Sequence, residues 1–270
     1  SDVYKRQAFF HRPKIYTEDW DEDERFILFS KDVIHVMQKL GWSPDIIHVN
    51  DWQTALIPVL LKENYKWDSL FHKTKTVLTI HNIGYQGRFS LDSYKRAELP
   101  RDLYENFGIL VHEGDSNFLK AGILYSDIIN TVSDTYAKEL LTPEYGSGMD
   151  GYLWLRHTDF FGIVNGVDYT VWDPETDSTI PYNYSLKNMS GKLKNKKALL
   201  EKLSMPFSSE VPLIGLVSRL VAQKGFDIIG DVLVDLLKLD AQFVILGSGS
   251  PEYEQMFQNA ANSYPNKIGV

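Results

Sequence analysis

Short apolar runs alternate with amphipathic helical patterns along the chain, and this alternation constrains the fold more than any other feature of the sequence. The strand-like runs of a first series are residues 45–49, 76–80, 127–132 and 161–164. The helical patterns around them are residues 24–41, 54–65 and 133–141, the last with Ser133 as its N-cap. Parallel strands need long crossover connections, which are usually helices, so the alternation predicts a parallel α/β sheet.

A second series of the same kind follows a polar stretch over residues 165–185, whose composition suits a connection between domains. Its strands are predicted over 211–217, 242–246 and 267–270, and its helices over 187–203, 226–239 and 252–261. The polar segment 82–116 is long for a loop and predicts an excursion from the first sheet. We therefore expect two Rossmann-like domains, over residues 8–164 and 165–270, with a cleft between them.

Composition excludes several classes of protein. The 270 residues carry 28 Lys and Arg against 36 Asp and Glu, so a nucleic-acid partner is not expected. The absence of cysteine rules out a disulfide scaffold, thiolate zinc sites and a cysteine nucleophile, and the histidines show no metal-ligand spacing. No apolar run approaches the roughly 20 residues that span a bilayer, and the polar start is not a secretory signal. We expect a cytoplasmic protein without a membrane contact, metal or cofactor.

Ligands of doubly wound sheets bind outside the carboxyl ends of the strands. Five polar or aromatic candidates follow the strands of the first series: Asp51, Trp52, His81, Asn82 and Asn165. His81 has the chemistry of a hydrogen-bond donor or a base, or it is a structural histidine bonded to backbone. Asp51 either holds a sugar hydroxyl or caps the following helix. Trp52 is either a platform for the apolar face of a sugar or a core residue.

The second domain carries two cations just after its first strand. Arg219 and Lys224 lie in a turn that can direct a forked guanidinium and a compact ammonium toward one diphosphate, or they are exposed loop cations. Gly247 and Gly249 follow the next strand, where backbone can approach a ligand closely. The G-x-G-x-x-G pattern at residues 146–151 follows a helix and not a strand, which predicts a surface loop and not a dinucleotide site.

Motifs from about Phe9 to Val270 resemble one family. They are residues 43–48 (SPDIIH), 50–55 (NDWQTA), 79–87 (TIHNIGYQG), 117–122 (NFLKAG), 131–133 (TVS), 145–151 (YGSGMDG), 165–168 (NGVD), 172–174 (WDP), 218–220 (SRL) and 223–225 (QKG). Each motif is modest alone, but their order over most of the chain is specific. The chain resembles the bacterial glycogen synthase and plant starch synthase family, which are retaining glycosyltransferases of the GT-B fold.

The resemblance implies an enzyme that transfers glucose from ADP-glucose to the non-reducing 4-OH end of an α-1,4-glucan such as glycogen, with retention of the anomeric configuration. Arg219 and Lys224 match the pair that binds the donor diphosphate and stabilises the departing nucleotide. Fixed cations suit this step because they need no reorganisation as charge develops. His81 matches the histidine that contacts the donor glucose near the scissile bond.

The remaining candidates match positions around the two sugars. Asp51 and Asn165 match contacts on the side of the donor glucose. Trp52 and Asn82 match positions near the acceptor glucan. Asn50 departs from the pattern, because many members of the family have a histidine before this Asp-Trp pair.

The resemblance also implies a piece of a longer enzyme, with both GT-B domains truncated. The family's Lys-x-Gly-Gly loop would lie before Ser1, so the first domain would lack its first strand and loop. The catalytic glutamate and the glycine-rich helix start of the second domain would lie beyond Val270. Residues Ser1–Gln7 are expected to be foreign to the natural protein. These 270 residues alone are therefore expected to be inactive.

Other functions remain open from the sequence. One is a different GT-B glycosyltransferase that uses a UDP- or GDP-sugar. Another is a non-catalytic glucan-binding relative, although the presence of His81, Arg219 and Lys224 argues against it. A nicotinamide oxidoreductase is a distant third, because the phosphate-binding pattern lacks its strand.

Overall fold

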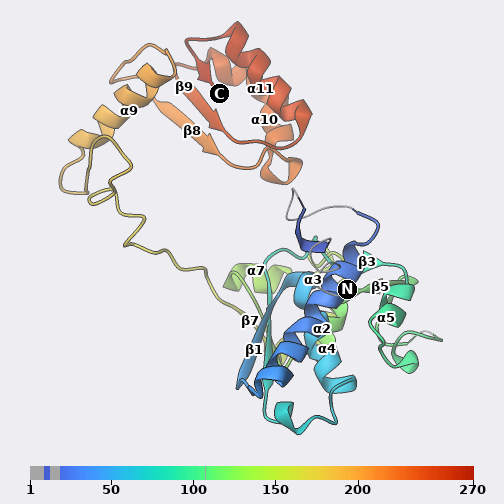
Figure 1. The fold of residues 1–270 in the computed structure, drawn as a ribbon. Coiled ribbons are helices and arrows are strands. Elements are labelled where there is room, and N and C mark those ends of the chain that lie inside the picture. Colours follow the sequence, from blue (N-terminus) through green and yellow to red (C-terminus); the bar gives the residue numbers. More distant parts are fainter. Residues whose placement is uncertain (1–8, 13–18, 107) are drawn as a thin grey trace. The chain divides into compact units, whose positions relative to one another are not determined.

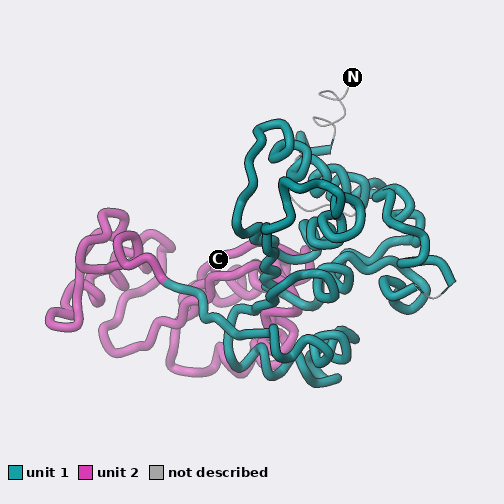
Figure 2. The backbone as a smooth tube through the Cα atoms, turned by 90° about the horizontal axis from the view of Figure 1, so that it is seen from below, with its two compact units in different colours: residues 1–166 teal, residues 167–270 magenta. Residues whose placement is uncertain are grey.

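The computed structural model describes residues 9–12, 19–106 and 108–270, so the expectation for Ser1–Gln7 lies outside the described residues. The chain divides into two compact units, residues 1–166 and residues 167–270 (Figure 2). Each unit contains a parallel sheet with helices (Figure 1). The α/β class predicted from the alternation of strands and helices is confirmed.

The main sheet of the first unit has four parallel strands in the order β1-β2-β6-β7. They are β1 (Ile46–Asn50), β2 (Lys75–Ile80), β6 (Ile128–Thr131) and β7 (Phe160–Gly162). Asn50 pairs with Thr79 across β1 and β2, and Thr79 pairs with Asn130 across β2 and β6. The carboxyl ends of these three strands therefore lie along one edge of the sheet.

In the described part of the first unit, helices precede β1 and lie between these strands. They are α2 (Glu22–Leu40), α3 (Asp51–Thr54), α4 (Leu56–Glu63), α5 (Asp92–Arg96), α6 (Phe118–Tyr125), α7 (Asp134–Glu139) and α8 (Asp150–Leu155). Gly41 ends α2 in a left-handed conformation, as its place after the helical pattern predicts. Ser133 accepts a hydrogen bond from the Tyr136 N–H at 2.9 Å, which confirms it as the N-cap of α7.

The hydrophobic core of this unit lies on one face of the sheet. Ile34 of α2, Leu60 of α4 and Phe118 of α6 are fully buried there together with strand residues such as Leu78 and Ile129. The opposite face shows the alternate residues of the strands, because successive side chains point to opposite sides. This second face is open to solvent, with Ile46 at 59% and Phe161 at 50% exposure.

The predicted excursion between β2 and β6 contains a small antiparallel sheet. Its strands are β3 (Arg88–Phe89), β4 (Val111–His112) and β5 (Asp115–Asn117), in the order β3-β5-β4. Asn117 ends β5 and is the N-cap of α6, where its Oδ1 accepts from the Lys120 N–H at 2.9 Å. The start of α6 in turn binds the loop after β2, because Phe118 N–H donates to Gly87 O at 3.1 Å.

The second unit contains a three-stranded parallel sheet in the order β10-β9-β8. Its strands are β8 (Leu213–Val217), β9 (Gln242–Leu246) and β10 (Ile268–Gly269), and its helices are α9 (Ser190–Lys202), α10 (Phe226–Lys238) and α11 (Pro251–Ser263). Phe226, Phe243 and Phe257 form the centre of its core. The predicted order of strands and helices is confirmed here.

Two predicted helices differ from the observed ones. The pattern over 54–65 becomes two helices, because α3 begins at Asp51 and is separated from α4 by Ala55. The helix predicted from residue 187 begins at Ser190. Its start is delayed because the Asn188 side chain accepts from the backbone N–H and the hydroxyl of Ser190, which forms a local turn before the helix.

Candidate functional site

His81 follows the last residue of β2, and two consecutive residues at the end of β1 hold it. The His81 backbone N–H donates to Asp51 Oδ1 at 2.7 Å. The His81 ring lies beside Asn50, with 2.9 Å between its Nε2 and Asn50 Oδ1. Asn50 therefore orients the imidazole and Asp51 fixes the backbone of His81, while the exposed residue remains accessible to a ligand.

Asp51 has an uncommon backbone conformation, with φ at 53°. Few non-glycine residues occupy this left-handed region, and Asp and Asn do so most readily. The conformation accompanies the carboxylate contact with the backbone of His81, which crosses from one strand end to the next. The prediction that Asp51 caps the following helix is wrong, because it lies inside α3 after the N-cap residue Asn50 and its carboxylate binds His81 instead.

Trp52 lies largely inside the first unit, with only 8% of its surface exposed. Its ring centroid is 4.9 Å from that of Phe26 and 5.5 Å from that of Phe89. Gly87 packs on the indole so closely that a Cβ atom there would lie 2.4 Å from Trp52 Cε3. Trp52 therefore supports the loop that carries His81, and its contact with an acceptor glucan stays a prediction.

The loop from His81 to Gly87 is fixed by hydrogen bonds near its start. Asn82 folds back on the loop, where its Oδ1 accepts from the Gly84 N–H at 3.0 Å. The Ile83 N–H donates to the Tyr136 hydroxyl of α7 at 3.2 Å. The candidate residue Asn82 therefore shapes the loop through its side-chain oxygen.

Gln86 joins this loop to two other segments. Its Nε2 donates to the Ser147 carbonyl oxygen at 2.9 Å and to Ile83 O at 3.2 Å. Its Oε1 accepts from Asn117 Nδ2 at 2.8 Å. The side-chain amide thus connects the histidine loop, the glycine-rich segment 145–151 and the N-terminus of α6.

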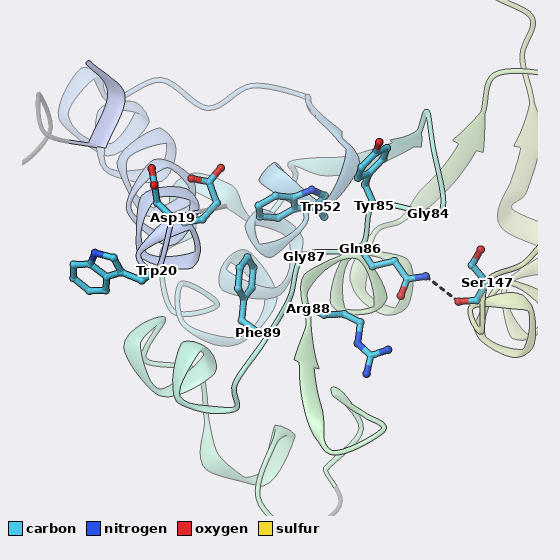
Figure 3. A pocket seen from close by; sticks show the side chains of 11 residues that line it. Asp19, Trp20, Trp52, Gly84, Tyr85, Gln86, Gly87, Arg88, Phe89 and Ser147 are labelled. Atoms are coloured by element: carbon cyan, nitrogen blue, oxygen red, sulfur yellow. Dashed lines mark hydrogen bonds between the residues drawn. The ribbon is translucent and has the colours of Figure 1, made fainter. Parts of the chain in front are cut away.

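An open pocket of about 670 Å³ lies beside the histidine loop (Figure 3). Its wall combines aromatic, charged, amide and hydroxyl groups from residues Asp19, Trp20, Glu22, Trp52, Gly84, Tyr85, Gln86, Gly87, Arg88, Phe89 and Ser147. Figure 3 shows the Gln86 amide directed toward Ser147. Aromatic surface together with a few placed polar groups suits a small polar ligand such as a sugar.

A buried basic cluster backs the glycine-rich segment. His112 is buried, and its Nε2 would lie 3.5 Å from a Cβ atom placed on Gly148. Lys120 is also buried, donates to Val111 O at 2.6 Å and lies 4.3 Å from the centre of the Tyr152 ring. Burial lowers the pKa of His112; Glu113 opposes this shift, whereas Lys120 and Arg88 add to it.

Arg219 and Lys224 lie after β8 in the second unit, in the turn that leads to α10. Both side chains are exposed, and neither makes a hydrogen bond or ion pair with any residue in the described part of the chain. Gly225 follows them with φ at 76° and is the N-cap of α10. The turn therefore presents two unpaired cations next to a helix N-terminus, where anions are stabilised.

Gly247 and Gly249 are required by close contacts between the loops after β8 and β9. A Cβ atom would lie 1.9 Å from Ser218 O at Gly247 and 2.2 Å from Leu220 O at Gly249. Leu220 N–H donates to Ser248 O at 2.9 Å and fixes the same contact. These glycines have a packing role in the structure, and their contact with a ligand stays a prediction.

The structure brings Asp51, Trp52, His81 and Asn82 together at one edge of the first sheet. The other group, formed by Arg219, Lys224, Gly247 and Gly249, lies at the strand ends of the second sheet. Asn165 is exposed and lies next to the boundary between the units.

Five residues beside the histidine loop or in the pocket wall are not among the candidates predicted from the sequence: Asn50, Tyr85, Gln86, Phe89 and Ser147. Asn50, Tyr85, Gln86 and Ser147 lie inside the quoted motifs, but spacing alone does not show which side chains meet in space.

Residues 9–12, 19–106 and 108–270 offer neither a metal cluster nor a membrane-spanning helix. No group of three or more His, Asp or Glu residues there is arranged to hold a metal ion. None of the helices in the same ranges has the length and apolar character needed to cross a membrane.

The fold places this chain among the Rossmann-like α/β proteins, a class in which ligands generally bind outside the carboxyl ends of parallel strands. A family model described as the starch synthase catalytic domain matches residues 2–154. The chain therefore belongs to the starch synthase catalytic domain family, as the motifs predicted.

Known proteins are similar over nearly the whole chain. The chain is 48% identical to a glycogen synthase of Thermosipho africanus, over 97% of this chain and 54% of that protein. It is 45% identical to a glycogen synthase of Streptococcus agalactiae, over 98% of this chain and 55% of that protein. It therefore spans about half the length of the curated relatives it matches.

A solved structure is also similar. It is the catalytic domain of starch synthase IV from Arabidopsis thaliana bound to ADP and acarbose, with 33% identity and a TM-score of 0.88 over 97% of this chain and 54% of that one. This similarity confirms the predicted GT-B type of fold.

Proposed function

We propose that this chain is part of a retaining glucosyltransferase, which transfers glucose from ADP-glucose to the non-reducing 4-OH end of an α-1,4-glucan. The observation that carries the proposal is the open aromatic pocket beside the His81 loop, in a chain of the starch synthase catalytic domain family. Similarity to glycogen synthases and to a starch synthase bound to ADP and acarbose supports a nucleotide-sugar donor and a glucan acceptor.

The donor diphosphate is assigned to Arg219 and Lys224. Cleavage of the bond between glucose and phosphate leaves negative charge on the nucleotide, and fixed cations lower that barrier without reorganisation. A guanidinium binds phosphate oxygens in a fork, and an ammonium acts as a compact charge. Both side chains are unpaired with described residues, so none of the described carboxylates competes with a phosphate for them. Gly247 and Gly249 are proposed to let backbone approach the same ligand.

The sugars are assigned to the first unit and to Asn165. His81 is proposed to contact the donor glucose, with Asp51 and Asn165 on the same side. Trp52 and Asn82 are proposed to lie near the acceptor, for which the aromatic pocket offers the rings of Tyr85, Phe89 and Trp20. Aromatic rings pack on the apolar faces of sugars, and nearby polar groups fix the hydroxyls.

Glucan binding tests the acceptor half of the proposal in this chain directly. Titration with maltoheptaose is expected to change tryptophan fluorescence, because Trp52 and Trp20 line the pocket. A β-1,4-linked glucan of equal length is the matched control ligand. Tyr85→Ala is expected to weaken binding of maltoheptaose while the fold remains intact by circular dichroism. Equal binding of both glucans, or no binding of either, would contradict the acceptor assignment.

A sugar-transfer assay tests the donor nucleotide and the proposed reaction. Incorporation of labelled glucose into glycogen is measured with ADP-, UDP- and GDP-glucose, using this chain and the full-length product of the gene that encodes it. We expect no transfer by these 270 residues and transfer from ADP-glucose by the full-length protein. Arg219→Ala and Lys224→Ala are each expected to reduce kcat strongly in the full-length protein. Preference for another nucleotide would overturn the donor assignment, and glucan binding without any transfer would favour a non-catalytic role.

A further inference from the structure

Asn50 is held rigidly at the end of β1, immediately beside the candidate histidine. Its backbone N–H donates to Thr54 Oγ1 at 2.7 Å, and the same hydroxyl donates to Asn50 O at 2.9 Å. One side chain of α3 thus fixes both backbone polar groups of Asn50. The backbone of Asn50 is therefore fixed relative to β2, which pairs with β1 up to this residue.

The His81 residue is fixed from the same strand end at two points. Asp51 Oδ1 accepts from its backbone N–H at 2.7 Å, and Asn50 Oδ1 lies 2.9 Å from its ring Nε2. An amide oxygen only accepts hydrogen bonds, so the ring nitrogen opposite it must carry the proton. In a neutral imidazole the other nitrogen is then an acceptor.

We propose that Asn50 is a positioning residue that holds the His81 imidazole as the Nε2–H tautomer and presents Nδ1 as an acceptor toward a ligand. No residue in the described ranges bonds Nδ1, and His81 is exposed. An asparagine suits this role because its amide neither adds a charge beside the ring nor takes up a proton in place of it.

The tautomer determines whether Nδ1 of His81 accepts or donates a hydrogen bond at the candidate site. An Nδ1 acceptor binds a hydroxyl that donates, whereas an Nδ1–H would bind an oxygen that accepts. The sugar hydroxyl as the group bound there rests on the proposed function, but the tautomer itself does not. The two are therefore tested by separate measurements.

Nitrogen NMR of the chain labelled with ¹⁵N-histidine tests the tautomer without any substrate. Spectra are recorded well above the ordinary histidine pKa of about 6.5, and His81 is assigned from the signals that disappear in His81→Gln. The wild type is expected to show a pyrrole-type Nε2 and a pyridine-type Nδ1. Asn50→Ala is expected to move both shifts toward the average of two exchanging tautomers.

Asn50→Asp is the matched variant, because a carboxylate can accept but cannot donate. It is expected to keep the Nε2–H pattern and to decide the question even where Asn50→Ala fails to fold. The signals of His35 serve as an internal control, since this residue of α2 bonds the Tyr65 hydroxyl. An Nδ1–H pattern in the wild type, a change of tautomer in Asn50→Asp, or unchanged His81 shifts in a folded Asn50→Ala would each overturn the proposal.

A transfer assay on the full-length product distinguishes the functional consequence from the tautomer. Asn50→Ala is expected to lower kcat at saturating donor, and Asn50→Asp is expected to restore part of it. An Nε2–H wild type whose transfer rate does not respond to Asn50→Ala would overturn the role in sugar binding while the tautomer stands. Absence of transfer by the wild type would contradict the proposed function alone.

Discussion

The contact between Gly87 and Trp52 makes a quantitative prediction about the support of the histidine loop. In Gly87→Ala the new Cβ would lie 2.4 Å from Trp52 Cε3 and 2.7 Å from Cδ2, well inside the 3.0 Å that real Cβ atoms keep. The indole cannot withdraw easily, because Phe26 and Phe89 pack against it with ring centroids at 4.9 Å and 5.5 Å. The backbone also has φ at 62°, which alanine adopts only with strain.

The magnitude follows from three contributions. The left-handed conformation costs alanine about 1–2 kcal/mol, and overpacking against the ring costs about 1–3 kcal/mol. The lower entropy of the unfolded alanine chain offsets roughly 0.4–1 kcal/mol of this. We therefore expect Gly87→Ala to lower the free energy of unfolding by about 3 kcal/mol.

Gly41→Ala is the matched control, because Gly41 has φ at 59° but no heavy atom within 4 Å of a Cβ placed there. The Gly41→Ala variant has the backbone strain without the steric contact. We therefore expect its free energy of unfolding to fall by only about 1 kcal/mol. Urea unfolding followed by circular dichroism and tryptophan fluorescence gives both values for the transition of the first unit. Equal losses for the two variants would show that Trp52 yields to the new methyl group and would refute the reasoning.

Three further predictions concern other parts of the first unit. Burial alone would raise the pKa of Asp127, but hydrogen bonds from Thr76 and the charge of Lys62 outweigh it and lower that pKa. The unfolding free energy should therefore decrease as the pH falls below about 4, and Asp127→Asn should flatten this dependence in urea titrations. The pKa of His112 is lowered, mainly by burial, so the unfolded state binds its proton first. Stability should decrease as the pH falls from about 6.5, and less so in His112→Gln. Gln86→Met should speed amide hydrogen exchange in residues 146–148 by about tenfold, because one hydrogen bond to Ser147 is lost. Exchange in α10 of the same variant should stay unchanged and serves as the control.

The order of helices and strands could be predicted from the sequence, because the spacing of apolar residues differs between a helix and a strand. The run at 242–246 became a strand with the same bounds, since a short run of mostly apolar residues between turns has few alternatives to a buried strand. Gly41 and Ser133 ended and began helices as predicted, because capping depends only on neighbouring residues.

The role of Asp51 could not be predicted in the same way. Local rules favour a cap for an aspartate before a helical pattern. The carboxylate instead binds the backbone of His81, which is 30 residues away in sequence and adjacent only once β1 and β2 pair. The contact with His81 thus takes the place of the local cap, and no sequence pattern within the helix predicts that contact.

The Gln86 contacts show the same limit for the pocket. The motif 79–87 predicted a functional loop, but the partners of Gln86 come from residues 117 and 147. Both partners depend on the small antiparallel sheet and on the turn after α7, neither of which has a strong sequence period. The position of a motif could be predicted, whereas the contacts that hold it required the fold.

The bonding state of the candidate groups differs between the two units, and this difference bears on their chemistry. Asp51 and Asn82 already use side-chain oxygens to shape the loop around His81. The side chains of Arg219 and Lys224 make no hydrogen bond or ion pair with the described residues. A side chain that is held by hydrogen bonds keeps one orientation. This suits contact with an uncharged sugar, for which the orientation of the contacting groups matters most. An exposed cation without a protein partner gives up only water when it meets a phosphate, which is what the proposed donor assignment requires of Arg219 and Lys224.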